Sequence, residues 1–168
     1  DFTRSLTKTF YFIGLGKGDE IADYSVGFDT ASTNTKSYTK YKYEPATGST
    51  TPRDAGMLTA ADTDACMVQS WSYKKNLGVS ATTEAATDFT RSLTKTFYFI
   101  GLGKGDEIAD YSVGFNTAST ETKSYTKYYY EPAAATPTVI RQASALTAAD
   151  TDACMVQSWS YKKNLSTS

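Results

Sequence analysis

Two cysteines, Cys66 and Cys154, are the strongest nucleophiles in this chain, and each follows the same segment, LTAADTDA. The chain has no histidine, so Cys–His and Ser–His catalysis and histidine-ligated metal sites are all excluded. Three states stay open for the cysteines: reduced thiols packed as small hydrophobic groups, a disulfide between them, or covalent attachment of a prosthetic group. We therefore predict no catalytic residue and no cofactor, and we expect a protein that is not an enzyme.

A glycine-rich stretch, GLGKGD, occurs at 14–19 and again at 101–106. A phosphate-binding loop would need Lys followed by Ser or Thr at the start of a helix, whose N–H groups face the phosphates. Here Asp19 and Glu20 follow and would repel an anion, and the residues after them alternate as in a strand. The stretch therefore predicts the turn of a β-hairpin in which glycines take positive φ.

Clustered carboxylates suggest two further kinds of site. The DTD triplets at 62–64 and 150–152 offer oxygen donors to calcium, but they lack the glycine and the distal glutamate of a calcium loop. Asp19, Glu20 and Asp23 could supply a glycosidase pair, but they cluster at an expected turn in solvent. We predict solvated turns at these places, with no metal site.

Tyrosine and tryptophan are the residues best suited to a binding surface, and the chain contains 13 Tyr and 2 Trp. Their rings provide rigid, amphipathic contact area, which is why they concentrate at recognition surfaces. Ordinary packing of a sheet explains the same pattern and stays open as the alternative. The candidate binding residues are Tyr38, Tyr41, Tyr43, Trp71, Tyr73, Tyr125, Tyr128, Tyr130, Trp159 and Tyr161.

The charge balance restricts the partners. Seventeen basic and 18 acidic residues leave a net charge of −1, which gives no electrostatic footprint for nucleic acid. No apolar run approaches the roughly 18 residues that span a bilayer, so membrane insertion is not predicted. We expect protein partners or self-assembly, with a glycan or small ligand as the alternative. An extracellular or cell-surface location is favoured.

Most of the sequence is present twice. Residues 1–45 align with 88–132 at all but three positions, and residues 58–77 are identical to 146–165. The three differences are Asp29/Asn116, Asn34/Glu121 and Lys42/Tyr129. The sequence therefore predicts a tandem duplication.

We expect a first repeat unit at 1–77, a linker at 78–87 and a second unit at 88–168, and the two units could share one core. A natural unit could instead begin near Leu58, in which case the chain is part of a longer array.

Alternation of polar and apolar residues predicts β-strands in each unit. The segment 7–15 is apolar on both faces, which indicates a central strand covered on both sides. In the segment 36–44, Tyr41 and Tyr43 share one face, and we expect the opposite face, with Tyr38, to point outward.

The segment 65–77 fits a strand better than a helix, because its apolar residues would scatter around a helix. A short helical turn before it is expected to begin at Thr59, with Asp62 completing the cap. The alternative is an α+β chain with 58–77 and 80–93 helical.

The predicted fold is mainly β, with about four antiparallel strands in each unit. A lone four-stranded sheet leaves an apolar face open, so we expect the two units to pack as a pseudo-twofold sandwich or barrel. The predicted function is a non-catalytic binding or assembly protein, a structural or linker subunit that presents two equivalent surfaces. The alternatives are a small-ligand or carbohydrate-binding protein with one aromatic site per repeat, and a scaffold carrying a prosthetic group on each cysteine.

Overall fold

The computed structural model describes residues 7–28, 35–74, 94–116, 121–132 and 138–162. The strands are β1 (Thr7–Phe12), β2 (Ile21–Phe28), β3 (Thr35–Tyr43), β4 (Arg53–Asp54), β5 (Met67–Lys74), β6 (Thr94–Phe99), β7 (Ile108–Phe115), β8 (Thr122–Tyr130), β9 (Arg141–Gln142) and β10 (Met155–Lys162). The 3₁₀ helices are η1 (Ala55–Met57), η2 (Ala60–Asp62), η3 (Ala143–Ala145) and η4 (Ala148–Asp150). In the part of the chain that is described, no helix is long and apolar enough to cross a membrane.

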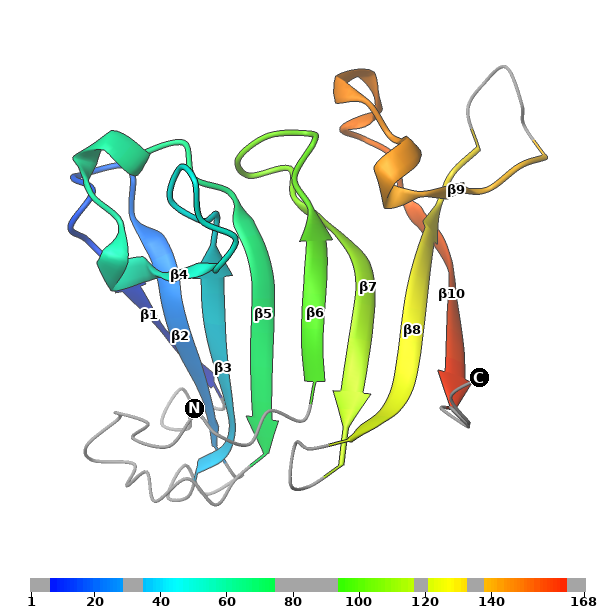
Figure 1. The fold of residues 1–168 in the computed structure, drawn as a ribbon, viewed down its shortest axis with the longest axis horizontal. Helices are drawn as coiled ribbons and strands as arrows, with labels where there is room; N and C mark the ends of the chain where they lie inside the picture. The colour runs from blue at the N-terminus through cyan, green and yellow to red at the C-terminus, as the bar shows by residue number, and fades with distance from the viewer. Residues whose placement is uncertain (1–6, 29–34, 75–93, 117–120, 133–137, 163–168) are drawn as a thin grey trace, which may run out of the picture.

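The strands form one antiparallel sheet of ten strands, so the mainly β prediction is confirmed. The long strands lie side by side in the order β1-β2-β3-β5-β6-β7-β8-β10, and the short β4 and β9 pair with β3 and β8. Figure 1 shows this open sheet from β1 in blue to β10 in red, with the 3₁₀ helices at one end of the strands.

The arrangement of the two halves differs from the sandwich or barrel that we expected. The strands of residues 7–74 and those of residues 94–162 meet edge to edge, because β5 pairs with β6 along the backbone. Edge pairing satisfies the N–H and C=O groups of both strands, which a face-to-face packing would have left open at the edge. The sheet therefore continues across the chain instead of folding onto itself.

The glycine-rich stretch forms the β1–β2 hairpin turn, as predicted. Gly16 and Gly18 take positive φ values of 113° and 96°, a conformation that glycine adopts without steric cost. The Gly18 N–H donates to a carboxylate oxygen of Glu20 at 3.0 Å, so the acidic residue closes the turn. The same geometry recurs in the β6–β7 hairpin, where the Gly105 N–H donates to Glu107 at 2.9 Å.

The prediction of a central strand at 7–15 is wrong for β1, which lies at an edge of the sheet and is largely exposed. The identical residues of β6 lie between β5 and β7 and are all partly buried. The difference in burial between β1 and β6 therefore depends on which strands lie beside them, and the local sequence does not specify those neighbours.

The segment before β5 forms the predicted helical turn. The Thr59 N–H donates to the Asp62 carboxylate at 2.9 Å, and the Thr59 side chain accepts from the Asp62 backbone N–H, which together form a capping box. The helical alternative for 58–77 is wrong, because Met67–Lys74 is a strand that pairs with β3. The linker predicted at 78–87 and the helical alternative at 80–93 lie outside the described residues.

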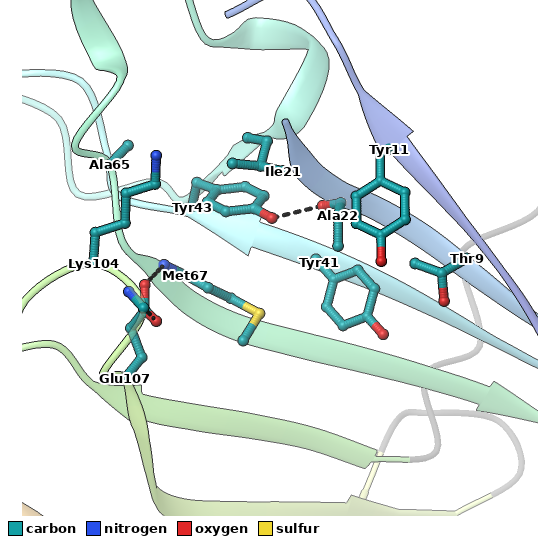
Figure 2. Close-up of a pocket in the computed structure, with 11 residues that line it drawn as sticks. Thr9, Tyr11, Ile21, Ala22, Tyr41, Tyr43, Ala65, Met67, Lys104 and Glu107 are labelled. Atoms are coloured by element: carbon teal, nitrogen blue, oxygen red, sulfur yellow. Dashed lines mark hydrogen bonds between the residues drawn. The ribbon is translucent and has the colours of Figure 1, made fainter. Parts of the chain in front are cut away.

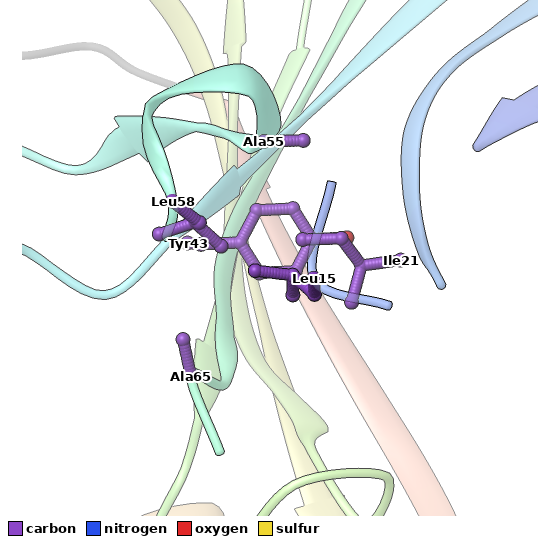
Figure 3. Packing of buried hydrophobic residues seen from close by; sticks show 6 residues of the cluster. All are labelled: Leu15, Ile21, Tyr43, Ala55, Leu58 and Ala65. Carbon is purple, nitrogen blue, oxygen red and sulfur yellow. The ribbon is translucent and has the colours of Figure 1, made fainter. Parts of the chain in front are cut away.

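A hydrophobic cluster packs beneath the 3₁₀ helices at that end of the sheet (Figure 3). Its buried members are Leu15, Ile21, Tyr43, Ala55, Leu58 and Ala65. The counterpart around Leu102, Tyr130, Ala143 and Leu146 has the equivalent residues Ile108 and Ala153 only partly buried. The second cluster is thus more open on that side.

The expectation that Tyr38 faces outward is wrong, because its side chain is only 2% exposed. Tyr38 packs with Val26, Phe28 and Tyr73 in a second cluster on the opposite side of the sheet from Tyr43. Both faces of this half of the sheet therefore carry buried side chains.

Candidate functional site

Rows of stacked aromatic rings cross the strands on one face of the sheet, which we call the aromatic face. In the first row, Phe10 stacks on Tyr24 at 4.5 Å between ring centroids, and Tyr24 stacks on Tyr38 at 5.3 Å. Tyr73 meets Tyr38 edge-on at 6.2 Å. Such cross-strand pairs of aromatic rings stabilise a sheet beyond the area that they bury.

An equivalent row lies on the same face in the second half of the sheet. Phe97 stacks on Tyr111 at 4.4 Å, and Tyr111 stacks on Tyr125 at 5.3 Å. The same stack of three rings therefore occurs in each half of the aromatic face, with Tyr38 buried in the first half and Tyr125 partly exposed in the second.

The opposite face, which we call the hydroxyl face, carries chains of hydroxyl contacts between strands. Ser25 lies 2.9 Å from both the Thr9 hydroxyl and the Tyr41 hydroxyl. Across the boundary between the halves, the Ser70 hydroxyl lies 3.1 Å from that of Tyr98. These contacts join side chains of five different strands.

The candidate binding residues therefore do not form one flat surface. Strand alternation and register place Tyr38, Trp71, Tyr73, Tyr125, Trp159 and Tyr161 on the aromatic face, and Tyr41, Tyr43, Tyr128 and Tyr130 on the hydroxyl face. Burial divides them further. The large exposed members, Trp159 at 46% and Tyr161 at 50%, both belong to β10.

An open pocket of about 390 Å³ lies where the two halves of the sheet meet (Figure 2). Tyr11, Tyr41 and Tyr43 line it from the first half, and Lys104 and Glu107 reach it from the β6–β7 hairpin of the second half. Aromatic walls beside a few charged groups are typical of sites that bind polar ligands.

The β6–β7 hairpin holds the wall of the pocket against β5. Glu107 accepts a hydrogen bond from the Met67 N–H at 3.0 Å. The Lys104 ammonium donates to the Thr63 carbonyl and lies 3.7 Å from the Asp19 carboxylate. These contacts join the two halves beyond the backbone pairing of β5 with β6.

On the aromatic face, lysine side chains cover the boundary between the halves. The Lys95 ammonium lies 4.0 Å from the centre of the Trp71 ring, a distance at which a cation is attracted to the ring face. Burial and the neighbouring Lys42 charge lower the pKa of Lys95. The boundary is thus partly withdrawn from water.

Both cysteines are free in this structure, Cys66 buried and Cys154 exposed. Burial and the nearby Glu44 charge raise the pKa of Cys66 to about 11, so its thiol stays protonated at neutral pH. Because the thiolate is the reactive form, Cys66 is a poor nucleophile. Attachment of a group at either cysteine remains an untested alternative.

The DTD triplets lie in turns. Asp62 accepts from the Arg53 guanidinium at 2.8 Å, and Asp150 pairs with Arg141 at the same distance. Within the described ranges, no three His, Cys, Asp or Glu side chains gather where they could hold a metal ion.

Sequence reasoning missed Lys104 and Glu107 as residues of the pocket. Both belong to the second glycine-rich hairpin, for which the sequence predicts only a turn. No local signal distinguishes them from Lys17 and Glu20, which have the same surrounding sequence and do not line the pocket.

Comparisons with known proteins give no match: no family model, no curated protein and no solved structure matches this chain.

Proposed function

We propose that this chain is a non-catalytic assembly protein, a structural or linker subunit that presents two equivalent surfaces to protein partners or to other copies of itself. The observation that carries the proposal is the repetition of one aromatic row, Phe10–Tyr24–Tyr38 and Phe97–Tyr111–Tyr125, on one continuous sheet. Two equivalent surfaces on one body give avidity or bridge two partners.

The surroundings of the potential nucleophiles agree with a role without catalysis. The pKa of Cys66 is raised, which is opposite to the shift that activates a thiol. Asp62 and Asp150, whose pKa values are lowered, are each engaged by an arginine and a capping threonine. These groups hold turns together.

Light scattering over a range of protein concentrations tests the proposal. We expect the mean mass to rise above the monomer value of 18.3 kDa as concentration increases. A protein that stays strictly monomeric up to millimolar concentration would contradict self-assembly.

The pocket between the halves supports a second candidate, a small-ligand or carbohydrate-binding protein. Its tyrosines could stack on a sugar ring while Lys104 and Glu107 bind hydroxyl groups. A glycan array tests this candidate with Tyr41→Ala as the matched variant. Binding that Tyr41→Ala removes would support it, whereas a blank array would count against it.

A further inference from the structure

β5 and β6 meet in an antiparallel strand-to-strand interface of four residue pairs. Gln69 lies opposite Phe97, Ser70 opposite Thr96, Trp71 opposite Lys95, and Ser72 opposite Thr94. The contacts described above add side-chain interactions on both faces: the Ser70–Tyr98 hydroxyl contact and Lys95 over Trp71. The β6–β7 hairpin adds a third, from Glu107 to the Met67 N–H.

Both sides of this interface are present a second time, at the two edges of the sheet. The residues of β5, MVQSWSYK, recur in β10, and those of β6, TKTFYF, recur in β1. Among the described strands, β10 pairs only with β8, and β1 pairs only with β2. The chain thus carries an exposed copy of each side of its own internal interface.

Burial supports this reading of the two edges. Every described residue of β10 is exposed, whereas Ser70 and Tyr73 of β5 are buried. Tyr73 is 1% exposed and its counterpart Tyr161 is 50% exposed. At the other edge, Tyr11 is 60% exposed, whereas its counterpart Tyr98 is partly buried. An edge strand with exposed aromatic side chains is a template for pairing with another chain.

We propose that β10 of one chain pairs with β1 of a second copy, antiparallel and in the register of the β5–β6 interface. This inference rests on the proposed assembly function and names the partner and the surface. The expected opposite residues are Gln157 with Phe10 of the second copy, Ser158 with its Thr9, Trp159 with its Lys8, and Ser160 with its Thr7.

The side-chain contacts of the internal interface can form again in this pairing, because the residues are the same. Ser158 would meet Tyr11 of the second copy, and Lys8 of that copy would lie over Trp159. One residue beside the tryptophan differs between the two interfaces. The Lys42 ammonium lies over the Trp71 ring, whereas its counterpart Tyr129 packs its own ring on Trp159 at 4.7 Å between centroids. The face of Trp159 is thus supported from within its own chain.

The glycine-rich hairpin of the second copy already has the geometry that its Glu20 needs to contact the Met155 N–H. Glu20 is exposed and closes its turn as Glu107 does, with one carboxylate oxygen on the glycine N–H. In Glu107 the other oxygen accepts from the Met67 N–H. Glu20 would accept from the Met155 N–H in the same way.

A pocket equivalent to the internal one would form at the β10 edge when a second copy docks there. In the internal pocket, Lys104 and Glu107 form one wall beside Ala65 and Met67. The counterparts of these last two residues, Ala153 and Met155, stand at the free edge, and Lys17 and Glu20 of a docked copy would supply the missing wall. The pairing is heterologous, so it joins chains head to tail, and each added copy presents a new β10 edge to the next one.

Site-directed disulfide formation tests the register. One protein carries Ser158→Cys and the other Thr9→Cys, each in a background in which Cys66 and Cys154 are serine. We expect a disulfide-linked heterodimer only when the two proteins are mixed and oxidised. Ser160→Cys mixed with Thr9→Cys is the matched control, which lies two residues out of register and should cross-link far less.

Light scattering on the unmodified chain separates failure of this inference from failure of the proposed function. Assembly without the Ser158–Thr9 cross-link, or with cross-linked homodimers of either single variant, would overturn the pairing and leave the assembly function standing. A strictly monomeric chain would overturn both.

A charge-matched pair of variants provides a second measurement. Glu20→Gln removes the charged acceptor for the Met155 N–H, and hydrogen bonds to charged groups contribute enough that association should weaken about tenfold. Glu121→Gln removes the same charge at an exposed position between β7 and β8, outside the proposed strand pairing, and should leave association unchanged. Equal association by the two variants would contradict the proposed role of Glu20.

Discussion

Single tyrosine hydroxyl groups link β3 to β2 in the first half of the sheet and β8 to β7 in the second. The Tyr43 hydroxyl donates to the Ala22 carbonyl at 2.6 Å, and Tyr130 donates to Ala109 at the same distance. Burial raises the pKa of both tyrosines, that of Tyr130 to about 12, so both hydroxyls keep their protons at physiological pH. Each hydroxyl therefore remains a hydrogen-bond donor and holds its tyrosine ring in place within one hydrophobic cluster.

Tyr43→Phe removes this donor and leaves the ring in place. We expect the free energy of unfolding to fall by about 1 kcal/mol, because one buried hydrogen bond is lost. Urea unfolding followed by fluorescence measures the change. Tyr11→Phe, at a residue that is 60% exposed, is the control and should change stability little in the monomer. Equal effects of the two variants would contradict an anchoring role for Tyr43.

The two cysteines should react at different rates, although their local sequences are identical. Cys154 is exposed, whereas Cys66 is buried and has a pKa raised to about 11. At pH 8 and low protein concentration, we expect a maleimide to modify Cys154 first and Cys66 slowly. Mass spectrometry of the Cys154→Ser variant isolates the slow reaction. Equal rates for the two thiols would show that their environments do not differ.

At the scale of the elements, the capped turns η2 and η4 make stability depend on pH. Hydrogen bonds from Arg53 and from Thr59 lower the pKa of Asp62 in the folded state, and the same kinds of contact lower that of Asp150. A lowered folded-state pKa stabilises the fold above the unfolded value, about 3.9, and this contribution is lost as the pH falls.

We therefore expect the temperature at the midpoint of thermal unfolding to decrease as the pH is lowered below about 4. The double variant Asp62→Asn and Asp150→Asn should show a flatter dependence, measured by circular dichroism from neutral to acidic pH. Asp64→Asn with Asp152→Asn removes the same charges two residues along the chain and should retain the steep dependence. A flattened curve in this control would assign the effect to net charge.

Local alternation predicted most of the long strands, the hairpin turn at 14–19 and the cap at Thr59, because each depends on residues close in sequence. It did not predict which strands are neighbours. TKTFYF is an edge strand at 7–12 and a central strand at 94–99, so no property of those six residues alone decides the position. The two-residue strands β4 and β9 lie in the segments that differ between the copies and carry no alternation.

The candidate site was predictable only in part for the same reason. Aromatic composition indicated Tyr41 and Tyr43, which line the pocket. Lys104 and Glu107 enter it from a hairpin that is distant in sequence from β3. Their role depends on how the two halves join, and that arrangement was expected to be face to face.

At the scale of the whole molecule, repeated strands in unequal positions give an internally controlled measurement of stability. β5 and β10 have the same sequence, so their amides exchange with solvent at equal rates when unfolded. In dilute solution we expect amides of β10 to exchange faster than those of β5, because an edge strand opens more easily. Amide NMR resolves the two copies.

The strands β2 and β7 provide the control for this comparison. They share one sequence and both have neighbours on two sides, so their exchange rates should agree. A difference between β2 and β7 as large as that between β5 and β10 would contradict the explanation by position in the sheet. Raising the protein concentration should slow exchange in β10 if copies associate at that edge.

The two edges of this open sheet are chemically different, since β1 stands at one and β10 at the other. Any row of chains joined through them therefore has a direction, with distinct leading and trailing ends that can grow at different rates. A chain in which β1 alone is disabled could still receive a neighbour at β10 but could not be added through β1. Such a chain would stop growth at one end of a row and leave the other end active, so a small fraction of terminator chains would make the rows grow from one end only.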